Sequence, residues 1–564
     1  MKTRILYHWP SNPHAIITHM LWFHASEGGN PMSMLRNCLL LLSLFSLAAC
    51  QSTTAVNDIL TNEQTLRLTI PHEIWRLDAS LAVDANETLI LNQVAEGLMR
   101  LDQNNRPIPA MAEKVSVSAD QTVYTFKLRN ALWQDGAPVT AYDFARAWKR
   151  TLHPKTDSPN AYLFYPIVNA QSYHQGEVSA DKVGITVVDE ETLQVRLSQP
   201  TRNFLTLLAL TPFLPQREFT QPPNANRSTL LNLKLNGPFV ILDVSADGTI
   251  VLKNNERYWD QEQVKLDYII FYVSNHPTQT INLYNADKID ITRIAREFAQ
   301  AYANTPEFHS IQLWTTQYIR FNSKNKFFQN KKIRQAISLA IDREQLVSVL
   351  KSQAQPAGGL IPPSMKGFRS AFREEAPLPP DKANLGKARA LLQEGMQELR
   401  ISQPPSALVM LSYEDDRMQL AVELKKQLKQ VLGLNLLLNT TSRAEKYRLE
   451  KRGEFDLTLS DWVATYPDAY TLLETFTSGH PANTGGYKDK PYDETLKRAA
   501  NSPQVQKQVK YLAQAEKFLI VEDHAAIPLY YVNDTTLIKQ RVKGHVRHPF
   551  GPPYSFKWAY IEEP

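Results

Sequence analysis

Cysteine is nearly absent from this sequence of 564 residues, which contains only Cys38 and Cys50. Two thiols cannot build a disulfide framework, and they are too few for a metal site made of cysteines. Hydrophobic cores must therefore stabilise the fold. The chain is too long for a single core, and we expect two or three domains.

Motifs of enzyme active sites are missing as well. The sequence has no H-E-x-x-H, G-x-S-x-G, P-loop or G-x-G-x-x-G pattern. His545 and His548 lie three residues apart beside basic residues, and we expect a surface loop there rather than a metal pair. We therefore expect neither catalysis nor a cofactor, and an enzyme is kept as the weaker alternative.

Charge of one sign is not concentrated anywhere. Lysine and arginine total 62 against 57 aspartates and glutamates, which gives a net charge of +5. No basic block or aromatic-basic repeat indicates a nucleic-acid partner, so we expect none. Internal repeats and low-complexity tracts are also lacking. The 43% hydrophobic and 21% charged residues are typical of a folded globular protein.

One apolar run is present near the N-terminus, at residues 39–49. It is too short to span a bilayer but suits the core of a signal peptide. Arg36 supplies the positive region before it, and Met34 is a plausible start. We interpret residues 1–33 as an upstream extension.

The run ends in Leu47-Ala48-Ala49-Cys50, which resembles a bacterial lipobox. In such signals the cysteine receives a diacylglycerol and becomes the new N-terminus. The resemblance implies that residues 1–49 are removed, that Cys50 is lipidated, and that residues 50–62 form a tether. It also implies a place in the cell envelope, in the periplasm or at the cell surface, anchored to a membrane by lipid. The alternative is a structural cysteine that follows an apolar run.

Residues 124–144 predict a strand, a turn and a helix. Tyr124, Phe126 and Leu128 alternate with polar residues, as in a half-buried strand. Asp135-Gly136 is a turn signal, and Thr140 can cap a helix that follows. The helix would bury one face made of Phe144, Ala147 and Trp148.

This stretch resembles the signature of the solute-binding proteins of peptide ABC importers, solute-binding family 5. Further segments match the family's motifs in the same order, and the resemblance covers residues 65–564. Asp287 stands where the family has glycine, so we expect a slightly different turn there. The matching segments are Leu77-Asp78, Glu96-Gly97-Leu98, Trp148-Lys149-Arg150, residues 154–161, Asn236-Gly237-Pro238-Phe239, residues 252–260, residues 284–290 and residues 333–343.

Residues 408–438 alternate as strand, helix and strand, which favours an α/β lobe with a partly parallel sheet. The family resemblance implies an α/β, periplasmic-binding-protein-like, two-lobe hinged trap (type II, cluster C) with an extra domain inserted in the N-terminal half. We expect lobe I at residues 63–96, 216–315 and 530–564. The inserted domain would span residues 97–215, and lobe II residues 316–529.

The resemblance also implies how a ligand is held. The lobes close on an extended peptide, which binds through its backbone as a strand added between them. Two segments match the family's backbone-binding strands, at residues 86–88 and 462–468. Trp462 is equally consistent with a core aromatic beneath the cleft. We expect ligand contacts at Asn86, Glu87, Thr88, Tyr162, Trp462, Val463, Ala464 and Thr465.

Thr465 departs from the family pattern. In the peptide binders this segment reads W-x-x-D-Y-x-D/E, and its first aspartate meets the α-ammonium of the peptide. The hydroxyl of Thr465 can accept a hydrogen bond but supplies no charge, and a charge-assisted bond is about twice as strong. We therefore predict that recognition of the ligand's N-terminus is weakened or altered. Compensation by Asp461 or Glu87 is the alternative.

The resemblance implies a monomeric substrate-binding lipoprotein that captures oligopeptides and delivers them to an ABC permease and ATPase complex. Fold does not fix the ligand, however. A haem, a metal complex or an antimicrobial peptide is an alternative ligand on the same scaffold. A surface lipoprotein that is uncoupled from import is the alternative from another functional class.

Overall fold

The computed structural model describes residues 63–217, 225–350, 353–379, 382–412, 417–464, 466–502 and 504–562. Residues Leu66–Pro564 form one compact unit. The predicted lipidation site Cys50 and the predicted tether at residues 50–62 lie outside the described residues. Among the described helices, none is long and apolar enough to cross a membrane.

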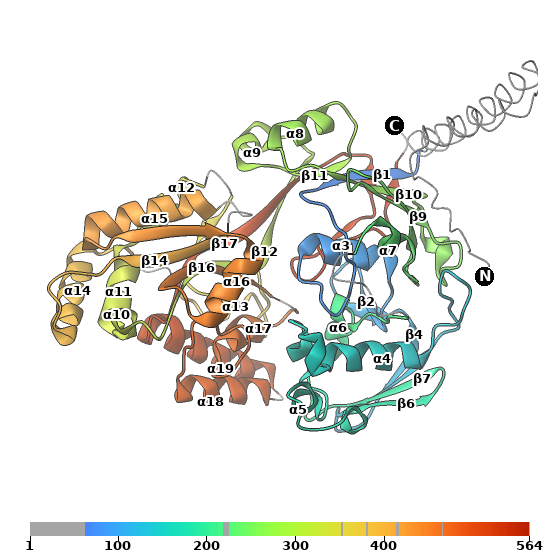
Figure 1. Ribbon diagram of the computed structural model, residues 1–564, viewed down its shortest axis with the longest axis horizontal. Coiled ribbons are helices and arrows are strands. Elements are labelled where there is room, and N and C mark those ends of the chain that lie inside the picture. Colours follow the sequence, from blue (N-terminus) through green and yellow to red (C-terminus); the bar gives the residue numbers. More distant parts are fainter. Residues whose placement is uncertain are drawn as a thin grey trace, which may run out of the picture. The chain divides into compact units, whose positions relative to one another are not determined.

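A sheet of eleven strands runs through the compact unit (Figure 1). The order is β15-β14-β16-β12-β17-β11-β1-β10-β9-β8, and β13 also pairs with β17. The strands are β1 (Thr65–Ile70), β8 (Phe239–Val244), β9 (Ile250–Asn254), β10 (Tyr268–Val273), β11 (Ile291–Arg293), β12 (Phe308–Phe321), β13 (Gln355–Pro356), β14 (Ala407–Ser412), β15 (Leu436–Thr441), β16 (Leu457–Val463) and β17 (Ala526–Ile538).

Two long antiparallel strands, β12 and β17, join the halves of this sheet. β17 pairs with β11 at its C-terminal end, and β12 pairs with β16 at its own C-terminal end. The two strands pair with each other from Phe308↔Leu537 to Arg320↔Ala526. The chain passes from one part of the sheet to the other along β12 and returns along β17. A hinge motion between the two parts would therefore bend these two strands.

The part of the sheet around β14 is an α/β layer. β14 pairs in parallel with both β15 and β16, which confirms the predicted partly parallel sheet. Its helices are α10 (Lys326–Gln329), α11 (Lys331–Ala340), α12 (Arg343–Ser348), α14 (Leu385–Leu399), α15 (Arg417–Leu432) and α16 (Arg443–Arg452), followed by α17 (Tyr470–Leu473), α18 (Lys490–Ala500) and α19 (Val505–Lys517).

Helix α14 extends to Leu399, and Arg400 follows it in the left-handed conformation. The Pro-containing segment 368–380 contains the short helix α13 (Phe372–Glu375). Phe372 is fully buried, and one buried ring is enough to fix a single turn without producing a periodic pattern.

The segment expected as the inserted domain carries a separate four-stranded sheet in the order β4-β5-β7-β6. The strand–turn–helix prediction is confirmed there, because β5 precedes a turn at Gly136 (φ 87°) and helix α4. The side chains of Phe144, Ala147 and Trp148 are buried, as expected. The elements are β4 (Ala112–Val117), β5 (Val123–Leu128), β6 (Ile185–Asp189), β7 (Thr192–Arg196), α4 (Ala141–Leu152), α5 (Ala170–His174) and α6 (Phe204–Leu207).

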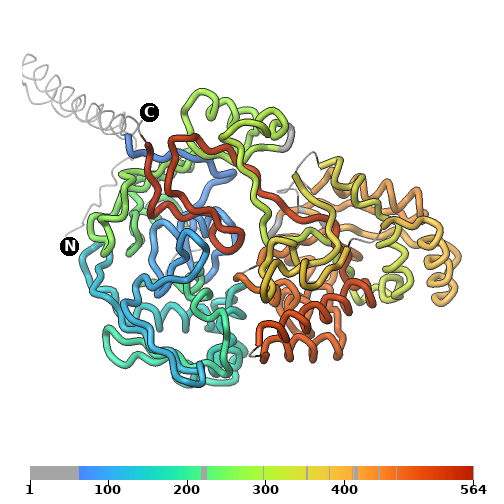
Figure 2. The backbone as a smooth tube through the Cα atoms, turned by 180° about the vertical axis from the view of Figure 1, so that it is seen from behind, coloured from blue at the N-terminus to red at the C-terminus, as the bar shows by residue number. Residues whose placement is uncertain are grey.

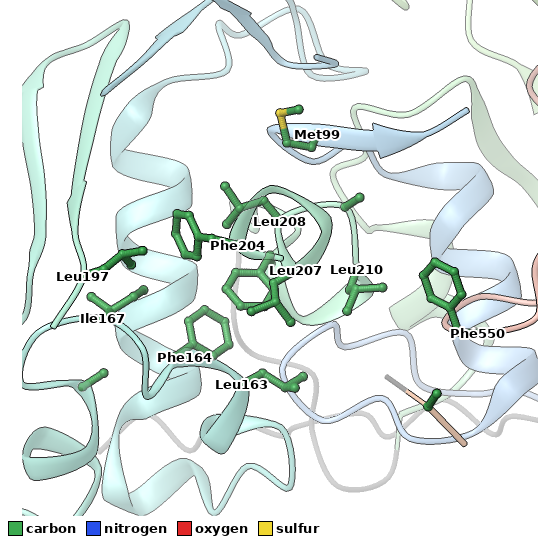
Figure 3. Close-up of a cluster of buried hydrophobic side chains, with 14 of the residues drawn as sticks. Met99, Leu163, Phe164, Ile167, Leu197, Phe204, Leu207, Leu208, Leu210 and Phe550 are labelled. Atoms are coloured by element: carbon green, nitrogen blue, oxygen red, sulfur yellow. The ribbon is translucent and has the colours of Figure 1, made fainter. Parts of the chain in front are cut away.

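Aromatic and aliphatic side chains fill the space beneath α4. Figure 3 shows Phe164, Phe204 and Leu207 grouped in this core. The ring of Phe164 stacks on Phe213 with centroids 4.0 Å apart, and Trp148 Nε1 donates to the Phe213 carbonyl at 2.9 Å. The large buried apolar area of these rings makes this core stable.

The C-terminal residues return to the first strands, so that the red and blue ends of the tube in Figure 2 lie together. Asn92 in α3 (Ala85–Val94) donates to the Tyr554 carbonyl at 2.8 Å. The remaining elements of this part are β2 (Met99–Leu101), β3 (Pro107–Pro109), α7 (Arg227–Leu231), α8 (Pro277–Asn285), α9 (Arg296–Tyr302), β18 (Val542–Lys543), β19 (Val546–Arg547), β20 (Tyr554–Ser555) and β21 (Tyr560–Ile561).

The prediction of a surface loop at His545 and His548 was wrong. His548 is only 3% exposed and lies within hydrogen-bond distance of Asn105 Oδ1 (2.5 Å) and Ser555 Oγ (3.0 Å). Burial lowers the pKa of both histidines to about 4. The pairing of β19 with β20 folds this polar-looking segment onto the core, which its composition did not show.

The expectation of a different turn at Asp287 was also wrong. Asp287 adopts the left-handed conformation that glycine favours, with φ of 58°. Its two carboxylate oxygens accept hydrogen bonds from Arg541 at 2.8 and 2.9 Å. Aspartate tolerates this region better than most residues, and the bidentate pair holds it there.

Candidate functional site

Asn86, Glu87 and Thr88 lie in the first turn of helix α3, so their prediction as a backbone-binding strand was wrong. Asp84 Oδ1 accepts the N–H groups of Asn86 (2.8 Å) and Glu87 (3.4 Å), and the Thr88 N–H bonds to the Asp84 carbonyl (3.0 Å). An aspartate at the helix N-cap satisfies these donors. The N–H groups are therefore not available to a peptide strand, and ligand contact through the side chains stays a prediction.

The two acidic residues considered as substitutes for the family aspartate differ in their surroundings. Arg417 donates to Asp461 Oδ1 at 2.8 Å, so this carboxylate already has a cationic partner. Burial raises the pKa of the Glu87 carboxyl, and nearby Arg76 opposes that effect. Thr465 itself lies outside the described residues.

Trp462 and Val463 end strand β16, which confirms a strand at the start of the second predicted segment. They pair with Thr316 and Thr315 of β12. Ala464 follows the strand, is fully buried, and donates its N–H to the Trp314 carbonyl at 2.7 Å. The Val463 side chain is 45% exposed.

Tyr162 meets Trp462 although the two residues are far apart in the sequence. Tyr162 lies in a 3₁₀ turn, Ala161–Phe164, and its ring centroid is 6.5 Å from that of Trp462. The ring of His480 lies 5.1 Å from Tyr162 in an edge-on arrangement. The structure thus brings together two predicted site residues and adds a third that sequence reasoning missed.

His480 stands in a Gly-His-Pro segment with no motif around it, so only its position in the fold reveals it. Its Nδ1 accepts the Ala482 N–H at 3.1 Å. Burial, with a smaller effect of Arg320, lowers the pKa of His480 to about 4. The imidazole is therefore neutral at pH 7, and with Nδ1 accepting, the proton is on Nε2.

Two ring N–H donors beside Tyr162 have no partner among the described residues. They are His480 Nε2 and Trp462 Nε1, and both atoms are buried. Buried donors are almost always hydrogen-bonded, and each one left unpaired costs about 1–3 kcal/mol. This unused capacity suits an acceptor oxygen supplied from outside the chain.

The loop after β16 adds tyrosines and carboxyl groups. Asp468 is 9% exposed and accepts hydrogen bonds from Asn203 Nδ2 (2.9 Å), Gln508 Nε2 (3.1 Å) and the Tyr470 N–H (2.9 Å). Burial raises the pKa of Glu474 to about 8, and the nearby Asp468 adds to this effect. Among the described residues, no group of three or more His, Cys, Asp or Glu side chains is arranged to hold a metal ion.

Comparisons with known proteins agree on one family. The model of the bacterial extracellular solute-binding proteins, family 5, matches residues 106–484. The dipeptide-binding protein DppE of Bacillus subtilis is 32% identical, over 83% of this chain and 87% of its own. The substrate-binding domain of an oligopeptide ABC transporter from Bacillus anthracis superposes with a TM-score of 0.81 at 33% identity, covering 89% of this chain and 99% of that one.

Two solved structures of a third relative also match. The murein tripeptide binding protein MppA of Escherichia coli is 27% identical and gives a TM-score of 0.78, covering 90% of this chain and all of its own. The unliganded open form of MppA gives only 0.66, covering 89% of this chain and 98% of its own. The present structure therefore superposes less well on the unliganded open form than on the other MppA structure.

The fold and these matches define an α/β two-lobe solute-binding protein of type II. The chain belongs to the bacterial extracellular solute-binding proteins, family 5.

Proposed function

We propose that this chain captures oligopeptides between its two lobes and delivers them to an ABC permease and ATPase complex. The relatives named as dipeptide-binding and oligopeptide-transporter proteins support this function. Binding requires closure and burial of the ligand and makes or breaks no covalent bond.

The observation in this chain that carries the proposal is the pair of buried donors beside Tyr162 that have no partner within the described part of the chain. Every peptide has carbonyl oxygens at regular spacing, whatever its side chains. Trp462 Nε1 and His480 Nε2 can each donate to such an oxygen, and the ring of Tyr162 offers an apolar surface next to them. A site of this kind selects for a peptide backbone more than for a particular side chain.

We further propose the arrangement around this site. Lobe I comprises residues 63–96, 216–315 and 530–564, the inserted domain residues 97–215, and lobe II residues 316–529. The predicted contacts through Asn86, Glu87, Thr88, Val463, Ala464 and Thr465 remain part of this proposal. The mature protein is a monomer held at a membrane of the cell envelope by lipid on Cys50.

Calorimetric titration tests the function. Protein freed of co-purified ligand by unfolding and refolding is titrated with di- to pentapeptides of mixed sequence, and with haemin and a nickel chelate as competitors of another class. We expect a saturable heat of binding with the peptides, and none with haemin or the nickel chelate. Binding of haemin or nickel chelate without any peptide binding would contradict the proposal.

N-acetylated peptides test the role of Thr465. Because its hydroxyl supplies no charge, we expect acetylation to weaken binding by less than about tenfold, or about 1.4 kcal/mol. The variant Thr465→Asp provides the matched control, and it should make binding depend strongly on a free N-terminus. A large loss with the wild-type protein would mean that another carboxylate meets the ammonium group.

A further inference from the structure

The two parts of the chain that supply Tyr162 and Trp462 also share a core. One continuous cluster of buried hydrophobic residues joins members from Leu98 to Phe213 with members from Ala464 to Ala526. Beside this apolar contact lies a polar one, made by Arg202 and Asn203 on one side and Asp468 and Gln508 on the other. We call these four residues the clasp.

Within the clasp, the carboxylate of Asp468 is fixed by hydrogen bonds from its own part of the chain. The Tyr470 N–H and Gln508 Nε2 both donate to Asp468 from the same part of the chain, so they keep the carboxylate fixed whether or not the contact is made. Two hydrogen bonds between described residues cross this polar contact: Asn203 Nδ2 to Asp468 Oδ2 at 2.9 Å, and Arg202 Nη1 to Gln508 Oε1 at 3.2 Å.

The acceptor in the first of these bonds is a buried carboxylate. Burial raises the pKa of Asp468, while its hydrogen bonds and nearby Arg202 act in the opposite direction. A hydrogen bond to a charged group contributes more than one between neutral groups. Loss of Asn203 from this carboxylate therefore disfavours the contact more than an average surface bond would.

The clasp is also connected to the candidate site. Asp468 lies in the loop that follows Trp462 and Val463, and Asn203 belongs to the same segment, residues 97–215, as Tyr162. A ligand that contacts Tyr162 and accepts from Trp462 Nε1 or His480 Nε2 would bridge the same two parts of the chain that the clasp bridges. Closure of the clasp and binding of the ligand would then favour each other.

We propose that the clasp, chiefly through the bond from Asn203 to Asp468, holds the inserted domain against lobe II. It thereby sets the fraction of the ligand-free protein that is closed. This inference rests on the proposed peptide-binding function. The poorer superposition on the unliganded open form of MppA, with a TM-score of 0.66 against 0.78 for the other MppA structure, supports it. Asn203 and Asp468 act here as positioning residues, because they change affinity through the closed fraction without touching the ligand. The apparent Kd equals the intrinsic Kd divided by that fraction.

The test compares Asn203→Ala and Asn203→Ser with Asn104→Ala, an exposed asparagine of the same segment. Small-angle X-ray scattering gives the radius of gyration without ligand and with saturating tripeptide, and calorimetry gives the Kd. We expect both Asn203 variants to have a larger ligand-free radius, a ligand-bound radius like the wild type, and a Kd raised about tenfold or more. Asn104→Ala should match the wild type.

Exchanging the amide of Asn203 and the carboxylate of Asp468 distinguishes loss of the clasp from a general loss of stability. Asn203→Asp places two carboxylates together and should open the ligand-free protein further. The double variant Asn203→Asp/Asp468→Asn restores an amide opposite a carboxylate and should recover part of the affinity.

If Asn203→Ala and Asn203→Ser match Asn104→Ala in both radius of gyration and Kd, the clasp does not set the closed fraction. The proposed peptide binding is not affected by that result. If the wild type binds no peptide, the proposed function fails, and the ligand-free radii still decide the clasp.

Discussion

Replacement of His480 by asparagine separates the functions of its two ring nitrogens. The Oδ1 atom of asparagine reaches the place of Nδ1 and can accept the Ala482 N–H, which Nδ1 accepts at 3.1 Å. Asparagine is too short to put a donor where Nε2 lies. Glutamine does the reverse, since its Nε2 reaches that place but its shape does not provide the Nδ1 acceptor.

The magnitude follows from one hydrogen bond. If Nε2 donates to a peptide carbonyl, its loss costs about 0.5–1.5 kcal/mol, which raises the Kd about two- to thirteenfold. Because Nε2 has no partner among the described residues, its removal breaks no hydrogen bond within that part of the chain. The ring contact with Tyr162 at 5.1 Å is lost in both variants and contributes about 0.5–1.5 kcal/mol.

Calorimetry with one tripeptide and chemical denaturation without ligand make the comparison. We expect His480→Asn to bind more weakly than His480→Gln, but to have the higher unfolding free energy, because only asparagine keeps the hydrogen bond to the Ala482 N–H. The exposed His276→Asn serves as control and should bind like the wild type. Equal Kd values for His480→Asn and His480→Gln would refute the reasoning, because the ring would then act through packing alone.

Two further predictions concern stability. Burial lowers the pKa of His548 from 6.5 to about 4, so on acidification the unfolded chain binds this proton before the folded chain does. The free energy of unfolding, compared with that of His548→Gln, should therefore fall as the pH decreases from about 6.5 to about 4. Urea titrations that show no such difference between the two proteins would contradict this. Asp287→Ala should be less stable than Asp287→Gly by about 1 kcal/mol. Both variants lose the hydrogen bonds from Arg541, but only alanine is strained at a φ of 58°. Equal midpoints of chemical denaturation for these two variants would show that backbone strain does not matter there.

Local patterns predicted much of the fold. The unit from Tyr124 to Trp148 was readable because its strand alternation, turn glycine and helix cap all agree. The parallel pairing of β14 and β15 followed from the strand–helix–strand order. Long-range pairing of β19 with β20, which buries His548, leaves no local pattern and could not be read in this way.

The candidate site shows the same division. Tyr162 and Trp462 were identified through family resemblance, and the structure places them together. Asn86–Thr88 are helical and not a strand because the Asp84 side chain caps helix α3 at this point. His480 carries no sequence signal, since its importance depends on a neighbour distant in the chain and on a buried donor with no partner in the ranges that the structure describes.

Native mass spectrometry of the protein purified from its own cells tests the central claim most directly. Gentle ionisation should show masses above that of the bare chain, and fragmentation of the released species should give peptide sequences of mixed composition. A haem, a metal complex or another non-peptide ligand bound in the place of peptides would contradict the assignment of this chain as a peptide receptor.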